Sequence, residues 1–393
     1  MKIEIRNGRV IDPKHGIDRK TSLYVAAGKV AAVGDAPEGW HAKRVLDAAG
    51  LVVCPGLIDA SARLREPGFE YKATLESEVA AAVAGGVTSL ACPPDTDPPL
   101  DEPGLVQMLK HRARSLNQAH VYPIGALTVG LKGDTHADAA LADTQVLLRA
   151  LQYAATFGYR VWLRPQDVHL ARGGVAHDGE VATRLGLPAI PGFAETIALD
   201  AIFELVRATG VHVHLARLST HDGVARVRAA KKAGLPVTCD VAIHHVHLCD
   251  VDIGWFNANC HLVPPLRGTR DRAALRAGLI DGTVDLICSD HTPVDDDAKQ
   301  LPFAEAEPGA TAVELLLPLT LKWAKEEKLP LSAALDRITA APARVLGLDA
   351  GQLAPGADAD VCVFDPDLHW VVAPSALRSQ GKNTPFLGLE VSG

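Results

Sequence analysis

The feature that most constrains the fold of this chain is a regular alternation of apolar and amphipathic segments between about residue 52 and residue 345. Runs such as 211–215 and 284–288 suit strands that are buried on both faces. Strands are expected at 52–60, 87–92, 120–126, 160–164, 211–218, 236–243 and 284–289, and helices at 74–84, 102–115, 143–157, 195–208, 221–233, 270–279, 311–326 and 331–345. Roughly seven or eight such strand–helix units predict an α/β protein with a TIM-type (β/α)8 barrel.

A doubly wound open sheet is the rival architecture. It is disfavoured because no Gly-x-Gly-x-x-Gly sequence follows the first strand. In a barrel the chemistry lies at the carboxyl ends of the strands, so the informative residues are those just after each apolar run.

The two ends of the chain have a different pattern. Residues 1 to about 52 are short apolar clusters separated by turn pairs such as Asn7-Gly8, and short strands recur between residues 360 and 372. Isolated hairpins are marginally stable, so the two end segments are expected to meet in one unit. We therefore predict a composite β-sandwich domain from residues 1–53 and 349–393, and a barrel from residues 54–348.

Composition excludes several classes of partner. The chain has 39 Lys+Arg against 47 Asp+Glu, a net charge of −8, and no basic run of the kind that binds nucleic acid. No apolar stretch approaches the roughly 18 residues of a membrane span, and the first residues lack the apolar core of a signal peptide. Seven scattered cysteines without a Cys-x-x-Cys pair indicate reduced thiols, so we expect a cytoplasmic protein.

Several short segments, in order along the chain, resemble the dihydroorotase branch of the amidohydrolase superfamily. They are Pro55-Gly56-Leu57-Ile58-Asp59, Leu64-Arg65-Glu66-Pro67-Gly68, Pro98-Pro99, Leu185-Gly186-Leu187-Pro188, Ser219-Thr220, Pro264-Pro265-Leu266-Arg267, Asp290-His291 and Lys382-Asn383-Thr384-Pro385-Phe386. The resemblance implies a metal-dependent TIM barrel with a small β-sandwich built from both termini.

The resemblance also identifies positions where the metal ligands of active members are missing. Ser61 and Arg63 stand where the family has His-x-His, Arg164 stands in place of the histidine of a His-x-Glu-Asp phrase, and Arg217 precedes Ser-Thr where another histidine is expected. A bridging acidic ligand has no counterpart between Gly130 and Leu147. Asp290 is the one surviving ligand.

The chemistry of these replacements argues against a metal independently of the family. A catalytic zinc site needs three or more lone-pair donors and an open position for water. A guanidinium group has N–H donors, no acceptor, and does not deprotonate in proteins. Without a metal, bound water keeps a pKa far above neutrality. We therefore expect no metal cofactor and no hydrolase activity.

The substrate contacts implied by the resemblance are eroded as well. Arg65 is retained, whereas Asp95 and Val263 stand where the family has asparagines. His291 is retained and Val294 replaces a nearby histidine. These positions are interpreted as a vestigial substrate site.

Two readings of the arginine-rich mouth remain open. In the first, Arg63, Arg164 and Arg217 fill the former metal cavity and link strands through Asp59, Asp167 and Asp290. In the second, the pocket binds a phosphate or carboxylate metabolite. Arg65 could likewise hold an anion, or form a salt bridge with Glu66 or Asp59.

Other residues capable of chemistry have simpler explanations. If Cys239, His244, His245, His247 and Cys249 lie on a strand, His245, His247 and Cys249 share one face, and a relocated zinc site is the alternative to ordinary packing. His212 and His214 are expected to be core residues. Cys54, Cys92, Cys288 and Cys362 lie in apolar segments, where free cysteine is an inert small hydrophobe.

The resemblance is greatest to the non-catalytic dihydroorotase-like chains of bacterial pyrimidine synthesis. It implies a pseudoenzyme that assembles or stabilises the catalytic chain of aspartate carbamoyltransferase, in a hetero-oligomer of about six plus six chains. Contacts between two copies of the chain are also expected. The alternative is an active dihydroorotase, or a related cyclic-amide hydrolase, with an unorthodox metal site.

Overall fold

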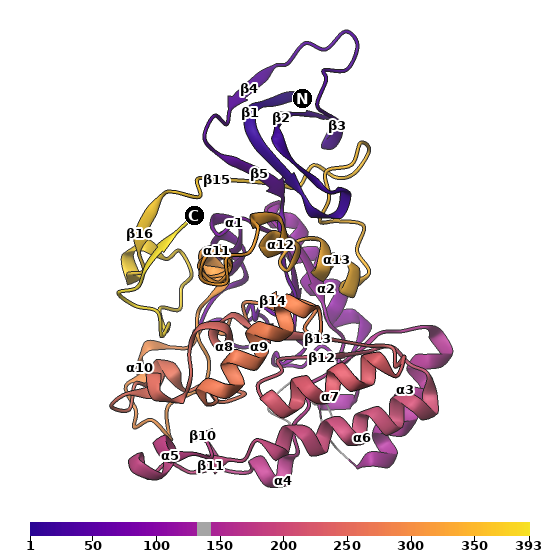
Figure 1. Cartoon of the computed structure of the whole chain (residues 1–393). Helices are drawn as coiled ribbons and strands as arrows, with labels where there is room; N and C mark the ends of the chain where they lie inside the picture. The colour runs from indigo at the N-terminus through magenta and orange to yellow at the C-terminus, as the bar shows by residue number, and fades with distance from the viewer. Residues whose placement is uncertain (132–142) are drawn as a thin grey trace.

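A barrel of parallel strands forms the centre of the molecule (Figure 1), in a computed structural model that describes residues 1–131 and 143–393. The barrel strands in the described ranges are β6 (Leu57–Asp59), β7 (Val87–Cys92), β8 (His120–Pro123), β9 (Val161–Leu163), β12 (Val213–Leu215), β13 (Val237–Ala242) and β14 (Leu286–Cys288). Each falls within a segment expected to be a strand. The TIM-type barrel predicted from the sequence is confirmed.

The barrel strands form two arcs. One sheet has the order β6-β7-β8 and the other the order β14-β13-β12-β9. At one seam the arcs are joined just beyond β6 and β14, where Ala62 bridges His291 and the Arg63 amide donates to the His291 carbonyl at 2.9 Å. At the other seam, β8 and β9 belong to separate sheets.

Helices cover the outside of the barrel, as the periodicity predicts. They are α1 (Leu75–Ala84), α2 (Pro103–Leu116), α3 (Thr144–Phe157), α6 (Phe193–Thr209), α7 (His221–Lys232), α9 (Thr269–Asp281), α11 (Leu316–Glu326), α12 (Leu331–Asp336) and α13 (Ala340–Leu346). The single helix expected over 331–345 is divided in two. Pro342 has no amide hydrogen to donate, so it is tolerated in the first turn of a new helix and not in the interior of a longer one.

Shorter elements connect these units. They are α4 (Val168–Ala171), β10 (Ala176–His177), α5 (Glu180–Leu185), β11 (Ala189–Ile190), α8 (Ile243–His247) and α10 (Asp296–Lys299), with single 3₁₀ turns at Pro13–His15, Val129–Leu131, Asp250–Ile253, Ala258–Cys260, Val313–Leu315 and Pro374–Ala376. Within the described ranges, no helix combines the length and the apolar character that crossing a bilayer requires.

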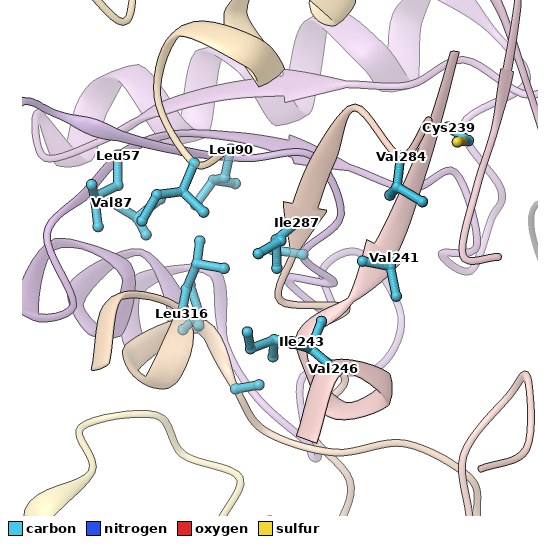
Figure 2. Close-up of a cluster of buried hydrophobic side chains, with 14 of the residues drawn as sticks. Leu57, Val87, Leu90, Cys239, Val241, Ile243, Val246, Val284, Ile287 and Leu316 are labelled. Atoms are coloured by element: carbon cyan, nitrogen blue, oxygen red, sulfur yellow. The ribbon is translucent and has the colours of Figure 1, made fainter. Parts of the chain in front are cut away.

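The apolar core fills the space between the strands and the surrounding helices. Figure 2 shows Leu57 and Leu90 from one arc, Ile287 from the other, and Leu316 from α11 among its members. These four side chains are completely buried. Burying a large aliphatic side chain contributes roughly 1.5–3 kcal/mol, so this cluster holds the strand ends in fixed positions.

Both ends of the chain contribute to a separate sheet beside the barrel (Figure 1). It contains β1 (Lys2–Asp12), β2 (Ile17–Ala26), β3 (Lys29–Val33), β4 (Arg44–Asp47), β5 (Val52–Pro55) and, from the C-terminal segment, β15 (Val361–Phe364). β15 pairs antiparallel with β5. The last strands, β16 (His369–Val371) and β17 (Glu390–Ser392), pair antiparallel, and β17 packs on α11. The domain boundaries at residues 53 and 349 stay predictions.

Candidate functional site

The carboxyl ends of the barrel strands bring together the side chains singled out in the sequence. Ser61 and Arg63 follow β6, Arg217 follows β12, and Asp290 follows β14. All four are buried, with between 2% and 7% of each residue exposed. The barrel mouth is therefore a packed polar cluster.

Asp290 lies at the centre of this cluster. Its Oδ1 accepts hydrogen bonds from Nη1 of Arg63 and Nη1 of Arg217, both at 3.1 Å, and the Ser61 hydroxyl lies 3.5 Å from the same oxygen. The backbones of Arg217 and Asp290 have φ values of +61° and +47°. Non-glycine residues are uncommon in this left-handed region, and such strain concentrates at functional sites.

A second carboxylate holds the other side of Arg63. Oδ2 of Asp95 accepts from Nε of Arg63 at 2.6 Å, and the Thr292 hydroxyl accepts from Nη1 at 2.9 Å. Asp95 is thus a partner of Arg63. A small cavity of about 100 Å³ remains, lined by Arg63, Arg65, Asp95, Arg217, Leu262, Val263, Asp290, Thr292, Glu307, Pro308 and Gly309.

Two buried carboxyl groups that follow or end barrel strands, those of Asp59 and Asp290, have opposite pKa shifts. Burial raises the pKa of Asp290, but the charges of Arg217 and Arg63 outweigh burial and hold it below its usual value. Burial raises the pKa of Asp59 to about 6, against hydrogen bonds from Ser289 and Ser61 that lower it. Asp290 is therefore the stable anion of the pair.

The proposed role of Asp59 as an arginine partner is wrong. Its Oδ1 accepts from the backbone amides of Ser61 and Ser289, at 3.2 and 3.0 Å, and its Oδ2 accepts from the Ser289 hydroxyl. Asp59 thus joins the segments that follow β6 and β14. Successive side chains of a strand point to opposite faces. Asp59 is the last residue of β6, and its carboxylate binds the backbone and hydroxyl groups of these two segments instead of the arginines.

The role expected for Asp167 is also wrong. Asp167 caps α4, because its carboxylate accepts from the Leu170 amide at 2.9 Å. Within the described ranges, Nη1 of Arg164 donates to Oε1 of Gln166 at 2.8 Å. An aspartate just before a helix satisfies an otherwise unpaired amide, and this local bond competes with a longer-range ion pair.

Arg65 forms neither of its two expected salt bridges. Its Nε donates to the Pro293 carbonyl at 2.8 Å and its Nη2 lies 3.8 Å from Glu307. Glu66 instead pairs with Arg112 at 2.8 Å. Arg65 therefore faces the mouth and holds the segment that follows Asp290.

The other positions of the presumed substrate site separate into two groups. Val263 lines the cavity, and its carbonyl accepts from Nη1 of Arg217 at 3.2 Å. Val294 is buried, and its amide donates to Oδ1 of Asn383 at 3.0 Å. The structure thus places Arg65, Asp95 and Val263 around the cavity and gives Val294 a structural contact.

His291 belongs to a second buried network. Its Nε2 lies 2.6 Å from Oε2 of Glu78, and its Nδ1 accepts from the amides of Ala312 and Val313 at 3.1 and 3.3 Å. Since Nδ1 accepts, the proton is on Nε2 and is donated to Glu78. Sequence reasoning did not identify Glu78, which lies in an ordinary amphipathic helix.

The histidine-rich segment after β13 is helical, and the prediction of a shared strand face is wrong. Nε2 of His245 contacts the Pro265 carbonyl at 3.2 Å, and Nε2 of His247 contacts the Leu319 carbonyl at 2.8 Å. Residues 243–247 form α8, and a helix turns successive side chains by about 100°. Among the described residues no group of three or more His, Cys, Asp or Glu side chains could hold a metal ion.

The described donors at the barrel mouth do not fit a catalytic zinc ion. The Asp290 carboxylate accepts hydrogen bonds from two guanidinium groups, and the Ser61 hydroxyl lies 3.5 Å from its Oδ1. Zinc requires several unprotonated nitrogen, sulfur or carboxylate donors. The segment between Gly130 and Leu147, where the sequence offers no bridging acidic ligand, includes residues 132–142, which lie outside the described residues.

Comparison with known proteins gives the class of this fold. The model of the amidohydrolase family matches residues 52–393. An L-hydantoinase from Arthrobacter aurescens superposes with a TM-score of 0.88 at 22% identity, covering 99% of this chain and 92% of that one. The chain belongs to the amidohydrolase family.

Sequence relatives place the chain more narrowly. A dihydroorotase-like protein of Pseudomonas aeruginosa is 45% identical over 404 residues, covering 99% of this chain and 95% of that protein. A dihydroorotase of Syntrophotalea carbinolica is 40% identical, covering 98% of this chain and 94% of that protein. Within the amidohydrolase family the chain is therefore dihydroorotase-like, as the sequence motifs indicate.

Proposed function

We propose that this chain is a non-catalytic dihydroorotase homologue that acts in pyrimidine biosynthesis as a cytoplasmic structural subunit of aspartate carbamoyltransferase. The observation that carries the proposal is the position of Asp290, the one carboxylate retained from the family's metal ligands. It is held by Arg63 and Arg217, each at 3.1 Å. The guanidinium groups take the place that a cation would need.

The electrostatics of the mouth support the loss of metal chemistry. A divalent cation next to Asp290 would face two fixed positive charges that cannot deprotonate. Both guanidinium groups are buried, so water screens this repulsion weakly. Moving either arginine aside would also leave a buried charge without its partner, which is costly.

The substrate contacts support the same proposal. The resemblance implies that active family members have, at the position of Asp95, an asparagine that helps to hold the substrate carboxylate. Here Asp95 carries a negative charge and is engaged by Arg63 at 2.6 Å. A second anion at this position would meet repulsion instead of a hydrogen-bond donor.

The role as a subunit follows from combining this mouth with an intact barrel. Its central strands and helices are retained with a continuous buried core, although the ligands of the reaction are replaced. A chain with this combination of features acts by binding a partner protein through its surface. The partner is taken from the resemblance to non-catalytic chains that assemble the catalytic chain of aspartate carbamoyltransferase, in about six plus six copies.

The test combines metal content, turnover and association. The purified full chain is expected to contain far less than one zinc per chain and to leave dihydroorotate unchanged after incubation with zinc. Mixed with the catalytic chain of aspartate carbamoyltransferase from the same organism, it is expected to elute earlier in gel filtration and to raise carbamoyltransferase activity.

Two results would overturn the proposal. Near-stoichiometric zinc together with dihydroorotate turnover would establish the alternative, an active dihydroorotase or related cyclic-amide hydrolase with unorthodox ligands. Separate elution of the two proteins, with unchanged carbamoyltransferase activity, would remove the structural role.

A further inference from the structure

Two cysteines lie directly opposite each other where the N-terminal and C-terminal parts of the chain meet. Cys54 in β5 and Cys362 in β15 are register partners in an antiparallel pair of strands (Figure 1). Each cysteine by itself is expected to be an inert small hydrophobe. The register adds a second thiol beside each of them, and two neighbouring thiols have a chemistry that one lacks.

Both cysteine side chains point to the same face of the sheet. Cys54 and Cys362 belong to the main core cluster. Val53 and Val361, which adjoin them along the two strands, pack with a separate cluster, as the alternation of side chains across a strand requires. A Cβ atom on Gly86 would lie 2.6 Å from Sγ of Cys362, so the glycine leaves room for this sulfur.

The backbone spacing permits a bond between the two sulfur atoms. The Gly56 amide donates to the Asp360 carbonyl at 2.8 Å, and hydrogen-bonded pairs recur at every second residue of an antiparallel ladder. Cys54 and Cys362 therefore form a hydrogen-bonded pair, in which the Cα atoms are about 5.5 Å apart. Disulfides span Cα distances of about 4.4–6.8 Å, so neither strand has to move away from the other.

A cavity gives a small oxidant access to one of the two thiols. Cys362 is 7% exposed, whereas Cys54 is completely buried. Cys362 lines a cavity of about 800 Å³, together with Gly86, Thr88 and Trp370. The pKa of the Cys54 thiol is raised well above its usual value by its hydrogen bond with Cys362 and by burial, so it stays protonated at neutral pH. Cys362 is therefore the thiol that an oxidant reaches first.

We propose that Cys54 and Cys362 form a reversible disulfide when the folded chain is exposed to hydrogen peroxide. The Cys362 sulfur attacks one peroxide oxygen, which gives a sulfenic acid and releases a water molecule. The Cys54 sulfur then attacks the sulfenic sulfur, and its proton leaves with the hydroxyl group as a second water molecule. Two thiols and one peroxide thus give one disulfide and two waters, and the bond links β5 to β15.

The position of the two cysteines in the ladder makes this disulfide easy to reduce. The Cβ atoms of directly opposite residues are about 4.5–5.5 Å apart, and those of a relaxed disulfide about 3.5–4.5 Å apart. Closing the bond therefore strains it, and strained disulfides are the readily reduced ones. Gly86 and Thr88 place the cavity at the amino end of β7, away from the barrel mouth, so this inference does not rest on the proposed function.

The first test uses the unmodified full-length chain, reduced and then treated with hydrogen peroxide under native conditions. After catalase removes the peroxide, free thiols are alkylated in denaturant and the peptides are mapped by mass spectrometry. Two of the 7 cysteines are expected to escape alkylation and to appear as one cross-linked pair of peptides that joins Cys54 to Cys362. Dithiothreitol is expected to restore both thiols. Any pattern of oxidation without this link would overturn the proposal, and so would a link that dithiothreitol does not reverse.

Three variants test the order of the two steps. Cys54→Ser is expected to leave a sulfenic acid on Cys362 that dimedone captures, and Cys362→Ser to leave Cys54 as a free thiol. Cys239→Ser is the control, because Cys239 is also completely buried in a strand but has Leu215 as its register partner. It is expected to form the disulfide to the same extent as the unmodified chain. Capture of Cys54 by dimedone in Cys362→Ser, or loss of the disulfide in Cys239→Ser, would contradict the proposal. If a variant does not fold, the peptide map of the unmodified chain decides.

Discussion

Nη1 of Arg217 lies 3.1 Å from Oδ1 and 3.4 Å from Oδ2 of Asp290, joining the ends of β12 and β14 across the barrel mouth. The two side chains are 2% and 9% exposed. Burying such a pair costs solvation free energy, and its attraction repays that cost when both partners are present. Removing one partner therefore lowers the stability of the fold by more than the intact pair contributes to it.

Asp290→Asn is expected to lower the free energy of unfolding by about 3–5 kcal/mol, because it leaves the buried charges of Arg63 and Arg217 without their shared carboxylate. Urea unfolding followed by circular dichroism measures the loss. Asp367→Asn is the control, since Asp367 is exposed and its replacement is expected to change stability by less than about 0.5 kcal/mol. A loss below about 1 kcal/mol for Asp290→Asn would contradict the buried network.

Replacing Ser61, Arg63, Arg164 and Arg217 together by histidine is expected to create zinc-dependent stability. The change removes guanidinium groups that hold Asp290 and supplies neutral nitrogen donors in their place. Zinc that binds the folded chain at one hundred times its Kd stabilises it by about 2.7 kcal/mol. Thermal unfolding in zinc and in chelator checks this expectation.

The unmodified chain is the control for the histidine variant. Its midpoint of thermal unfolding is expected to be the same in zinc and in chelator. A rise of the midpoint in zinc for the unmodified chain, equal to that of the variant, would show that the arginines do not decide metal binding.

The sequence predicts the fold better than it predicts the partners of the polar side chains. Apolar periodicity locates strands such as 87–92 because side-chain burial repeats along each element. The pairing of Arg63 and Arg217 with Asp290 also follows, since the carboxyl ends of all the barrel strands meet at the same mouth. What the pattern lacks is information on competing local bonds. The carboxylate of Asp167 accepts from the amide of Leu170, although Arg164 is only three residues away in the chain.

The histidine-rich segment shows a second limit. His244 and His245 continue the apolar run of β13, so alternation alone extends the strand through them. The chain instead turns into α8 after Ala242. A short apolar run does not distinguish a strand from a buried helix, and here the tertiary packing against α9 and α11 decides.

His244→Phe is expected to make the protein less sensitive to acid. Burial lowers the pKa of His244 to about 3, and its ring stacks on Phe386 with the centroids 5.9 Å apart. Neither ring nitrogen of His244 has a hydrogen-bond partner in the described part of the chain. As the pH falls below about 6.5, the unfolded chain binds a proton at this histidine that the folded chain does not, so stability is lost. Phenylalanine has no group that binds a proton, so the unfolded variant does not take up this proton.

Urea unfolding at a series of pH values between about 4 and 6 measures the effect of His244→Phe. The slope of unfolding free energy against pH is expected to decrease by about 1.4 kcal/mol per pH unit, the value for one proton. The raised pKa of Asp59 acts in the opposite direction, but equally in both proteins, so it cancels in the comparison. His41→Phe, at an exposed position, is the control and should leave the slope unchanged. An identical slope for His244→Phe and the unmodified chain would show that His244 titrates when folded.

Glu78→Gln is expected to loosen the C-terminal segment more than the barrel. Glu78 is completely buried, and its carboxylate accepts from Nε2 of His291 and the Ser379 hydroxyl at 2.6 Å each and from the Gln380 amide at 2.9 Å. Burial raises the pKa of Glu78, but these hydrogen bonds and the nearby imidazole bring it below its usual value, so its stabilising effect is present at neutral pH and lost as the pH falls. A hydrogen bond to a charged group contributes about 1.5–3 kcal/mol, and glutamine sets an NH₂ group against these donors.

Hydrogen–deuterium exchange distinguishes this local effect from a general loss of stability. In Glu78→Gln the amides of residues 378–383 are expected to exchange at least about tenfold faster, a change of about 1.4 kcal/mol in local opening, while those of β7 and β13 change less. Glu76→Gln, on the exposed side of the same turn of α1, should leave both regions unchanged. Equal acceleration across the barrel strands and residues 378–383 would mean that Glu78 stabilises the whole fold. The difference between the two regions therefore measures how far His291 and Glu78 together fasten the C-terminal segment to the barrel.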